Sequence, residues 1–239
     1  MNLYEAARAA LLYVSGNEGR FDSCNLNTDG AGLSWGILQW CQSTGNLGKV
    51  LSYVRNVDPA QFDAIMGPHA EAVVALCLAG KMDAVDGVHL WHDPWPTRFR
   101  VLGKAPWVQD AQVRYAFNGQ HMTGAVLALD KLGVRTQRAL TLLFDTAVQQ
   151  GPSRAVRIAS VARAAQPQHR LAAYALACAA GFQRTTPPSP PIPKARLSWQ
   201  PAGEGVWHLY SGRIDLFVDV TRRRNHILGD PSLSDDPLT

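Results

Sequence analysis

Two acidic residues in unlike settings, Glu18 and Asp29, carry the strongest indication of chemistry in this sequence. Glu18 follows an apolar helical run that includes Leu11–Val14, and Asp29 lies in a turn rich in Asn, Asp and Gly. Cleavage of a glycosidic bond requires two such carboxyl groups: one protonates the leaving oxygen, and the other activates water or stabilises positive charge. Apolar surroundings raise the pKa of a proton donor, which suits Glu18, whereas Asp29 in an exposed turn is expected to stay ionised. A solvated helix-end acid and a turn-forming aspartate are the competing interpretation.

Other polar residues of the same stretch are candidates for supporting roles. Asp22 is a third acid, which could place water or only support the turn. Thr28 and Ser34 could hydrogen-bond sugar or water, with turn capping as the alternative for Thr28. Gln39 lies in an apolar segment, where an unpaired side-chain amide is costly. A role in which this amide faces the substrate is therefore a hypothesis for Gln39.

Three aromatic residues, Trp35, Trp40 and Tyr115, have two interpretations. Their faces could stack on sugar rings, or their rings could fill the core, which is the commoner location of Trp and Tyr. Tyr115 is kept as a substrate-binding candidate.

The elements that must position these residues are mainly helical. Apolar positions at helical spacing predict a helix over Asn2–Ser15 that Gly16 ends, so Glu18 falls at or just beyond its C terminus. The turn-forming residues of Asn25–Gly32 predict the tip of a short β-hairpin, and Leu33–Trp40 begins an apolar helix or strand. Further helices are expected over 45–53, 58–80, 107–132, 135–150, 153–180 and 207–228.

Two proline-containing segments are expected to be loops. His89–Pro96 contains two prolines that cannot sit inside a helix. Its residues His89, His92 and Asp93 lack a further nearby ligand, so no metal site is expected. Thr185–Pro193 should be an extended surface loop, because the chain that follows is too short for an independent core. The whole chain, 1–239, is therefore predicted to be one mainly α domain.

The composition indicates a globular protein. The chain has 239 residues, 46% of them hydrophobic, enough for one core or for two small lobes around a cleft. Its formal net charge of +4 favours solubility or attraction to a polyanion such as a cell wall or nucleic acid. No apolar run approaches the roughly 18 residues of a membrane span, and Glu5 and Arg8 interrupt any signal-peptide pattern.

The four cysteines follow neither a zinc-binding nor a CxxC spacing. Free, mostly buried thiols are expected. Cys24 and Cys41 flank the acidic turn, so a disulfide between them is the alternative.

Three blocks of the sequence resemble the lysozyme-like superfamily, in particular its branch of bacterial chitosanases and related phage and bacterial peptidoglycan hydrolases. The first block is Glu18 followed by Asp29–Trp40, continued by a Cys and a Thr-Gly pair in Cys41–Leu47. The second is Leu143–Gly151, similar to an aromatic-Asp-x-Ala helix that ends in Gly, and the third is the arginine-bearing Asp219–Gly229. Together they cover about a third of the chain.

The resemblance implies roles for individual residues. Glu18 would be the general acid, and Asp29 the carboxylate that positions or activates water. Asp145 with Arg223 or Arg224 would form a buried ion-pair network that supports the acid, although a solvated charge run is the alternative for the arginines. The implied fold is α+β lysozyme-like, with two helical lobes and a small β-hairpin beside the active-site cleft. No cofactor is implied.

The substrate implied is the β-1,4 glycan of bacterial peptidoglycan, which would make the protein a lysozyme-type muramidase. The stretch between Glu18 and Asp29 is shorter than in typical chitosanases, and a basic chain with Arg20 in its site segment suits an anionic wall. The alternatives are a chitosanase and a non-catalytic glycan-binding module.

The resemblance also suggests a setting. A monomer is expected, with no nucleic-acid partner and no membrane insertion. It would be made in the cytoplasm and reach the periplasm or cell wall through a holin or a secretion system. An immunity protein would be a partner if the protein is an antibacterial effector.

Overall fold

The structure is a computed structural model that describes residues 1–18, 20–185, 197–211 and 213–239, apart from the side chains of residues 17, 18, 197 and 199. The chain divides into two compact units. Unit 1 combines Met1–Ala10 with Gln120–Thr239, and unit 2 is Leu11–Gly119. Helix α1 (Leu3–Glu18) therefore contributes residues to both units. It runs past Gly16, the residue expected to end it.

A three-stranded antiparallel sheet follows α1 in unit 2. Its strands are β1 (Cys24–Leu26), β2 (Leu33–Trp35) and β3 (Trp40–Cys41), in the order β1-β2-β3. The connection between β1 and β2 contains Asn27, Gly30 and Gly32 with φ of 62°, 79° and 79°. These backbone conformations are accessible to glycine and tolerated by asparagine, which explains the composition of the turn. The predicted β-hairpin is confirmed, and the apolar segment Leu33–Trp40 contains β2, a turn over residues 36–39 and the start of β3.

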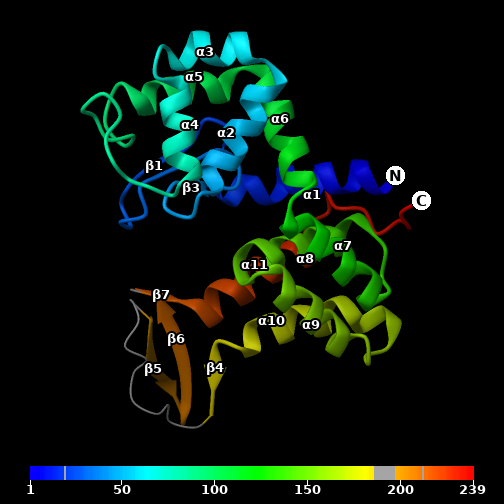
Figure 1. Cartoon of the computed structure of the whole chain (residues 1–239). Helices are drawn as coiled ribbons and strands as arrows, with labels where there is room; N and C mark the ends of the chain where they lie inside the picture. The colour runs from blue at the N-terminus through cyan, green and yellow to red at the C-terminus, as the bar shows by residue number, and fades with distance from the viewer. Residues whose placement is uncertain (19, 186–196, 212) are drawn as a thin grey trace. The chain divides into compact units, whose positions relative to one another are not determined.

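Five helices complete the described part of unit 2, and Figure 1 shows them in cyan to green: α2 (Asn46–Val57), α3 (Pro59–Met66), α4 (Ala70–Leu78), α5 (Trp95–Lys104) and α6 (Pro106–Phe117). Their apolar faces share one core with the sheet. At its centre the buried Trp35 donates from its indole N–H to the carbonyl oxygen of Phe99 at 3.0 Å. The sheet is therefore fixed to α5 by a bond that also satisfies a buried donor.

Two predicted boundaries were wrong. The helical block expected over 58–80 consists of α3 and α4, divided at Gly67, whose φ of 77° ends α3. The helix expected over 107–132 divides at Asn118–Gly119 into α6 and α7. The loop expected to extend to Pro96 stops earlier, because Trp95 and Pro96 begin α5. Proline is well tolerated in the first turn of a helix, where its missing N–H has no partner to lose.

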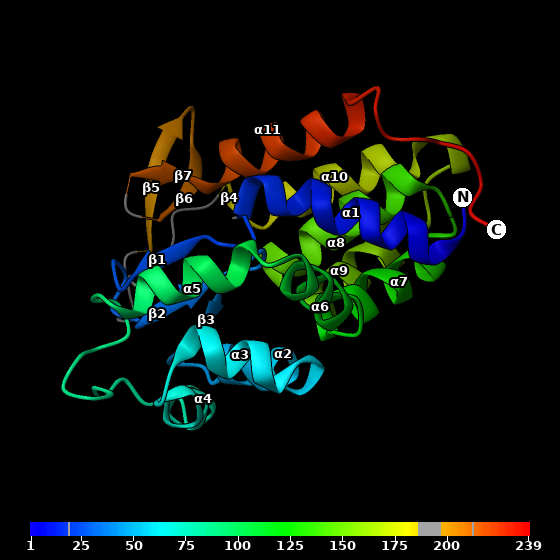
Figure 2. The same ribbon diagram turned by 90° about the horizontal axis from the view of Figure 1, so that it is seen from above.

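Unit 1 is built mainly from helices that pack around α8. They are α7 (Gln120–Leu132), α8 (Gln137–Gln150), α9 (Pro152–Ala162), the 3-10 turn η1 (Pro167–His169), α10 (Arg170–Ala180) and α11 (Leu216–Gly229). Figure 2 shows α10 and α11 side by side, in agreement with their direct contact. Helix α8 is buried along most of its length, and Gly151 ends it with a φ of 90°, close to where the sequence predicted. None of the helices in the described chain is long and apolar enough to span a bilayer.

A second antiparallel sheet lies in unit 1. It consists of β4 (Gln183–Arg184), β5 (Leu197–Gly203), β6 (Val206–Ser211) and β7 (Ile214–Asp215), with the order β4-β6-β5 and β7 paired to β6. The helix predicted over Trp207–Leu228 is therefore wrong in its first part. Positive φ values at Gly203, Glu204 and Gly205 reverse the chain, so that β6 pairs back onto β5. The Pro-rich loop predicted at 185–193 lies, beyond Thr185, outside the described residues.

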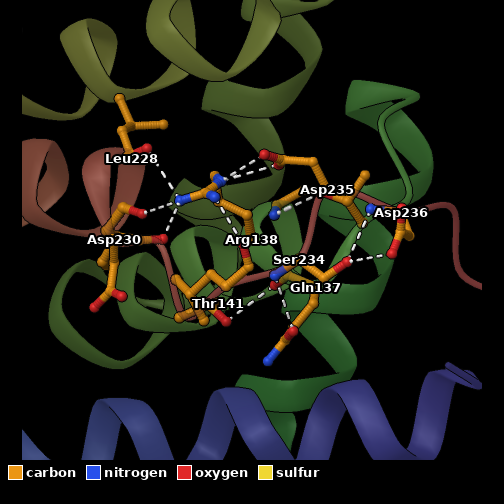
Figure 3. A network of polar contacts seen from close by, with 12 residues as sticks. Gln137, Arg138, Thr141, Leu228, Asp230, Ser234, Asp235 and Asp236 are labelled. Carbon is orange, nitrogen blue, oxygen red and sulfur yellow. Dashed lines mark hydrogen bonds and ion pairs between the residues drawn. The ribbon is translucent and has the colours of Figure 1, made fainter.

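The C-terminal segment is attached to α8 through Arg138 (Figure 3). The guanidinium of Arg138 donates to four backbone carbonyl oxygens, at 2.6–3.0 Å, those of Ile227, Leu228, Asp230 and Leu233. Its Nε also contacts both carboxylate oxygens of Asp235, at 2.9 and 3.0 Å. The carbonyl groups at the end of a helix lack partners within the helix, so Arg138 caps α11 while it holds the residues that follow.

Candidate functional site

The two candidate catalytic acids both belong to unit 2. Glu18 is the last residue of α1, and Asp29 lies in the connection between β1 and β2. Asp29 is exposed, and its Oδ1 accepts the backbone N–H of Ala31 at 3.2 Å. The side chain of Glu18 lies outside the described residues, so the roles of the two acids stay predictions.

Thr28 is engaged within the turn that carries Asp29. Its backbone N–H and its hydroxyl both donate to Oδ1 of Asn25, at 3.1 and 2.8 Å. A second asparagine of the turn, Asn27, accepts the N–H of Gly32 at 2.8 Å. This is the turn-capping arrangement that the sequence offered as the alternative to a sugar contact for Thr28.

Ser34 and Gln39 are both held within the sheet and its turns. Ser34 lies at the middle of β2 and is only 6% exposed. Gln39, in the turn between β2 and β3, donates from its side-chain amide to the carbonyl oxygens of Gly36 at 3.0 Å and Ser23 at 3.4 Å. The amide of Gln39 therefore has partners within the protein, and these bonds join the turn to the segment that precedes β1.

Asp22 is the third acid of this stretch, and it is mostly covered. Its side chain is 17% exposed and lies 3.6 Å from Nε of Arg20, which is 85% exposed. Helix α5 packs directly on this segment, because a Cβ at Gly103 would overlap the carbonyl oxygen of Phe21 and the Cα of Asp22. Packing thus fixes the backbone at Asp22, in line with its interpretation as support for the turn.

The aromatic candidates have different environments. Trp35 is fully buried and packs edge-on against Phe99, with 5.6 Å between ring centroids, so it belongs to the core. Tyr115 on α6 is half-buried, and its ring centroid lies 5.7 Å from that of Trp40 and 5.5 Å from that of Tyr53. Burial raises the pKa of Tyr115, so its hydroxyl remains a hydrogen-bond donor at any pH near neutrality.

Two buried glutamines hold the same sheet, and the sequence reasoning assigned a role to neither. Oε1 of Gln42 accepts the N–H of Leu33 at 3.0 Å, and its Nε2 donates to the carbonyl oxygen of Lys81 at 2.8 Å. Gln112 on α6 makes a matching pair of bonds, to the carbonyl oxygen of Phe21 and the N–H of Ile37. Both side chains are inaccessible to solvent. The sequence contained one indication of this role: Gln112 lies on the apolar face of α6, and a buried amide must find hydrogen-bond partners.

The residues proposed to support the acid lie in unit 1 and do form ion pairs with one another. Asp145 has no exposed surface, and its Oδ1 lies 2.7 Å from Nε and 2.5 Å from Nη2 of Arg223. Its Oδ2 pairs with Arg224, which is also fully buried and donates to Oε1 of Gln149 at 3.0 Å. Both arginines are therefore partners of Asp145, and the support of Glu18 by this network stays a prediction.

The cysteines are free thiols. Cys24 lies on β1 and Cys41 on β3, with β2 between them. Two strand spacings amount to about 10 Å, whereas a disulfide needs Cα atoms within roughly 7 Å of each other. The alternative of a Cys24–Cys41 disulfide was therefore wrong. Burial raises the pKa of the Cys24 thiol to about 11, with Arg100 acting in the opposite direction.

No group of three His, Cys, Asp or Glu side chains among the described residues is placed to hold an ion. In the loop before α5, His89 stacks on Trp91 with ring centroids 4.5 Å apart.

Comparison with known proteins identifies the fold. No protein-family model matches the sequence, and no curated protein matches it. A GH46 chitosanase from Gynuella sunshinyii, solved with chitotetraose, is similar over 95% of this chain and 88% of its own, with a TM-score of 0.57 and 15% identity. A chitosanase from Bacillus subtilis MY002, solved in native form and as a mutant with 6 GlcN, covers 74% of this chain and 76% of its own, with a TM-score of 0.54 and 13% identity. The chain thus has the lysozyme-like α+β fold, as the sequence predicted.

Proposed function

We propose that the protein is a glycoside hydrolase that cleaves the β-1,4 glycan strands of bacterial peptidoglycan. The observation that carries the proposal is the placement of Glu18 at the end of α1 and of Asp29 in the β1–β2 connection, within one compact unit. The likeness of the fold to two chitosanases supports the broader class, since both are hydrolases of amino-sugar polymers.

The mechanism assigns one task to each acid. Glu18 donates its proton to the glycosidic oxygen while the bond from that oxygen to the sugar carbon breaks. Asp29 accepts a proton from the water that adds to the same carbon, or stabilises the positive charge that develops there. In this scheme Glu18 must carry a proton before the reaction, and Asp29 must be able to accept one or carry negative charge.

Charge supports peptidoglycan as the substrate. The chain carries a formal net charge of +4, and the highly exposed Arg20 lies between the two acids in sequence. Peptidoglycan is anionic, so a chain of net positive charge is attracted to it, whereas chitosan is a polycation that the same net charge repels. A chitosanase remains the second candidate, because both structural neighbours are chitosanases determined with glucosamine-based oligomers.

The decisive experiment measures cleavage of both polymers. Purified sacculi and chitosan are incubated with the wild-type protein, Glu18→Gln and Asp29→Asn, and soluble fragments are quantified. We expect release from sacculi, and a loss of at least about 100-fold in either variant. Glu5→Gln, a change of the same kind in the first turn of α1, is the matched control and should retain activity.

Each alternative has its own result in this assay. If oligomers are released from chitosan while sacculi stay intact, the substrate is chitosan and not peptidoglycan. Binding to sacculi without cleavage would indicate a non-catalytic glycan-binding module. Asp22 and Asp29 are the two candidate partners of Glu18, so Asp22→Asn is assayed in parallel. The catalytic partner is the aspartate whose substitution causes the larger loss of cleavage activity.

We further propose that Asp145, Arg223 and Arg224 support Glu18. Their mutual ion pairs hold both arginines in place within unit 1, and the resemblance assigns such a network to the support of the acid. Asp145→Asn is then expected to lower kcat more than KM at a temperature where the variant is fully folded. Unchanged kcat in a folded variant would restrict this network to a role in stability.

The proposed setting is delivery into the periplasm of a target bacterium, by a holin or by a secretion system. Expression in Gram-negative cells tests it. The protein fused to an export signal should lyse the cells, the unfused protein should not, and Glu18→Gln should remove the toxicity. An immunity protein, if one exists, should suppress lysis when it is co-exported. Toxicity that persists in Glu18→Gln would exclude wall cleavage as its cause.

A further inference from the structure

The side-chain amide of Gln112 joins two backbone segments that are remote in sequence from α6 and from each other. Its Nε2 donates to the carbonyl oxygen of Phe21 at 3.0 Å, and its Oε1 accepts the N–H of Ile37 at 3.1 Å. The side chain is fully buried. A buried amide with a partner at each end connects the chain after α1 to the turn after β2, and we name this pair of bonds the Gln112 bridge.

The turn after β2 is shaped to admit this side chain. Gly36 has a φ of 83°, and a Cβ at this position would lie 2.6 Å from Oε1 of Gln112. Only glycine therefore accommodates both the backbone conformation and the amide. Gly32 has the same arrangement with the other buried glutamine. A Cβ at Gly32 would lie 2.7 Å from Oε1 of Gln42, which accepts the N–H of the next residue, Leu33.

The other end of the bridge reaches the segment that leaves the candidate acid. Phe21 follows the last residue of α1, Glu18, by three positions. The carbonyl oxygen of Ser23, a little further on, accepts the N–H of Gly36 at 3.0 Å. Helix α5 also closes on this segment through Gly103. The chain after Glu18 is thus held by two helices and by the turn that follows β2.

We propose that Gln112 is a positioning residue that fixes the end of α1, and with it Glu18, relative to the β-sheet that carries Asp29. This inference rests on the proposed glycoside hydrolase function. The bridge is specific for an amide, because the carbonyl oxygen of Phe21 requires a donor and the N–H of Ile37 requires an acceptor. Glutamine supplies both from one planar group, and a misplacement of about 1 Å at a catalytic acid can cost on the order of 100-fold in rate.

Gln112→Glu tests the bridge with almost no change in volume. An ionised carboxylate can accept from Ile37 but cannot donate to Phe21, whereas a protonated carboxyl group can do both. Burial raises the pKa of the introduced carboxyl group, so we expect kcat on the polymer that the wild-type protein cleaves to fall about 10- to 100-fold at a pH where this group is ionised, with KM within about twofold. The ratio of variant to wild-type kcat should rise as the pH is lowered, since protonation restores the donor. Taking this ratio cancels the pH dependence that the two proteins share.

Gln109→Glu is the matched control. Gln109 is on the same helix, and its amide also donates to backbone carbonyl oxygens, those of Gly103 at 3.2 Å and Lys104 at 3.4 Å. It has no bond to the chain after Glu18 in the described structure. Its substitution should therefore leave kcat, and the pH dependence of the kcat ratio, unchanged. An equal loss of kcat in both variants would overturn the inference, because it would indicate a general effect on α6.

A measurement without substrate separates this inference from the proposed function. Amide hydrogen exchange in Gln112→Ala should accelerate at least tenfold in peptides that cover 20–24 and 36–39, and not in α2. Unchanged exchange in both peptides would overturn the inference even if the enzyme is active. Absence of cleavage by the wild-type protein on either polymer would instead reject the proposed function. An active wild-type protein with an equally active, folded Gln112→Glu would reject only the positioning role.

Discussion

Asp145 and Arg224 form an ion pair in which neither side chain has exposed surface. Burial removes both charges from water, so each relies on partners within the protein. Arg223 adds a second, nearly covered guanidinium, with 17% exposure, on the other carboxylate oxygen of Asp145. The charged cluster of Asp145, Arg223 and Arg224 thus links α8 to α11 inside unit 1. Removal of one of its charges is expected to destabilise the protein.

The first prediction is that Asp145→Ala lowers the free energy of unfolding by about 3–5 kcal/mol, because it removes the buried carboxylate that Arg223 and Arg224 share. Urea unfolding followed by far-UV circular dichroism measures the change. The matched control is Arg222→Ala, since Arg222 is 80% exposed in a surface pair with Asp219. Its loss should cost about 0–1 kcal/mol. Similar costs for both variants would contradict the buried-pair argument.

The second prediction concerns the attachment of the C-terminal segment by Arg138. Arg138→Ala should destabilise unit 1 by more than about 3 kcal/mol, because several charge-assisted hydrogen bonds of roughly 1.5–3 kcal/mol each are removed together and do not add. Arg138→Lys should recover little of this, since an ammonium group cannot reproduce the geometry of the guanidinium. Limited proteolysis should release the residues after α11 faster in both variants.

Arg135→Ala is the control for Arg138. Arg135 is half-exposed and pairs with the equally exposed Asp130, and its backbone carbonyl still accepts the N–H of Leu238 after the substitution. A change below about 1 kcal/mol is expected. If Arg138→Ala were as mild as this control, the contacts in Figure 3 would not stabilise the segment.

The features that the sequence predicted well are those whose cause is local. The β1–β2 connection follows from Asn27, Gly30 and Gly32, whose positive φ values are preferences of those residue types. The end of α8 follows in the same way from Gly151. The paired carboxylate and arginines of α8 and α11 were suggested by resemblance, not by any local pattern.

The features that the sequence reasoning missed depend on distant contacts. Gln112 bonds to residues 75 and 91 positions away, so nothing in its own helix identifies its partners. Residues Val206–Ser211 form a strand because they pair with β4 and β5, although the apolar residues from Trp207 onwards allowed a helical interpretation. Tertiary pairing overrides local preference in short segments of this kind.

The third prediction concerns pH and Asp215, the N-cap of α11. Burial opposes its ionisation, but hydrogen bonds from His208, from the N–H of Val218 and from Tyr210 together lower its pKa. A lowered pKa in the folded state stabilises the protein above the usual carboxyl pKa, and this contribution is lost as the pH falls through the lowered value. Asp215→Asn should therefore be less stable than wild type at neutral pH, with the difference shrinking below about pH 4.

Asp219→Asn provides the comparison for Asp215, since Asp219 lies in the same first turn and pairs only at the surface with Arg222. The effect of Asp219→Asn on stability at neutral pH should be smaller, because its ion pair is at the surface. Thermal unfolding between pH 3 and pH 8 measures both variants. A stability difference for Asp215→Asn that grows in acid would reverse the sign and reject the argument.

The fourth prediction sets two helical glycines against each other. Gly48 of α2 lies against the backbone of α4, where a Cβ would overlap atoms of Cys77 and Leu78. At Gly16 of α1, a Cβ would meet no described heavy atom within 4 Å.

Alanine favours a helix over glycine by roughly 0.5–1 kcal/mol, so Gly16→Ala should stabilise the protein by about that amount. Gly48→Ala should instead destabilise it by more than about 1–3 kcal/mol, because backbone atoms of α4 cannot yield as a side chain does. Urea unfolding of both variants gives the two signs directly. A stabilised Gly48→Ala would mean that α2 and α4 can separate without cost, and it would contradict the close approach on which the core of unit 2 depends.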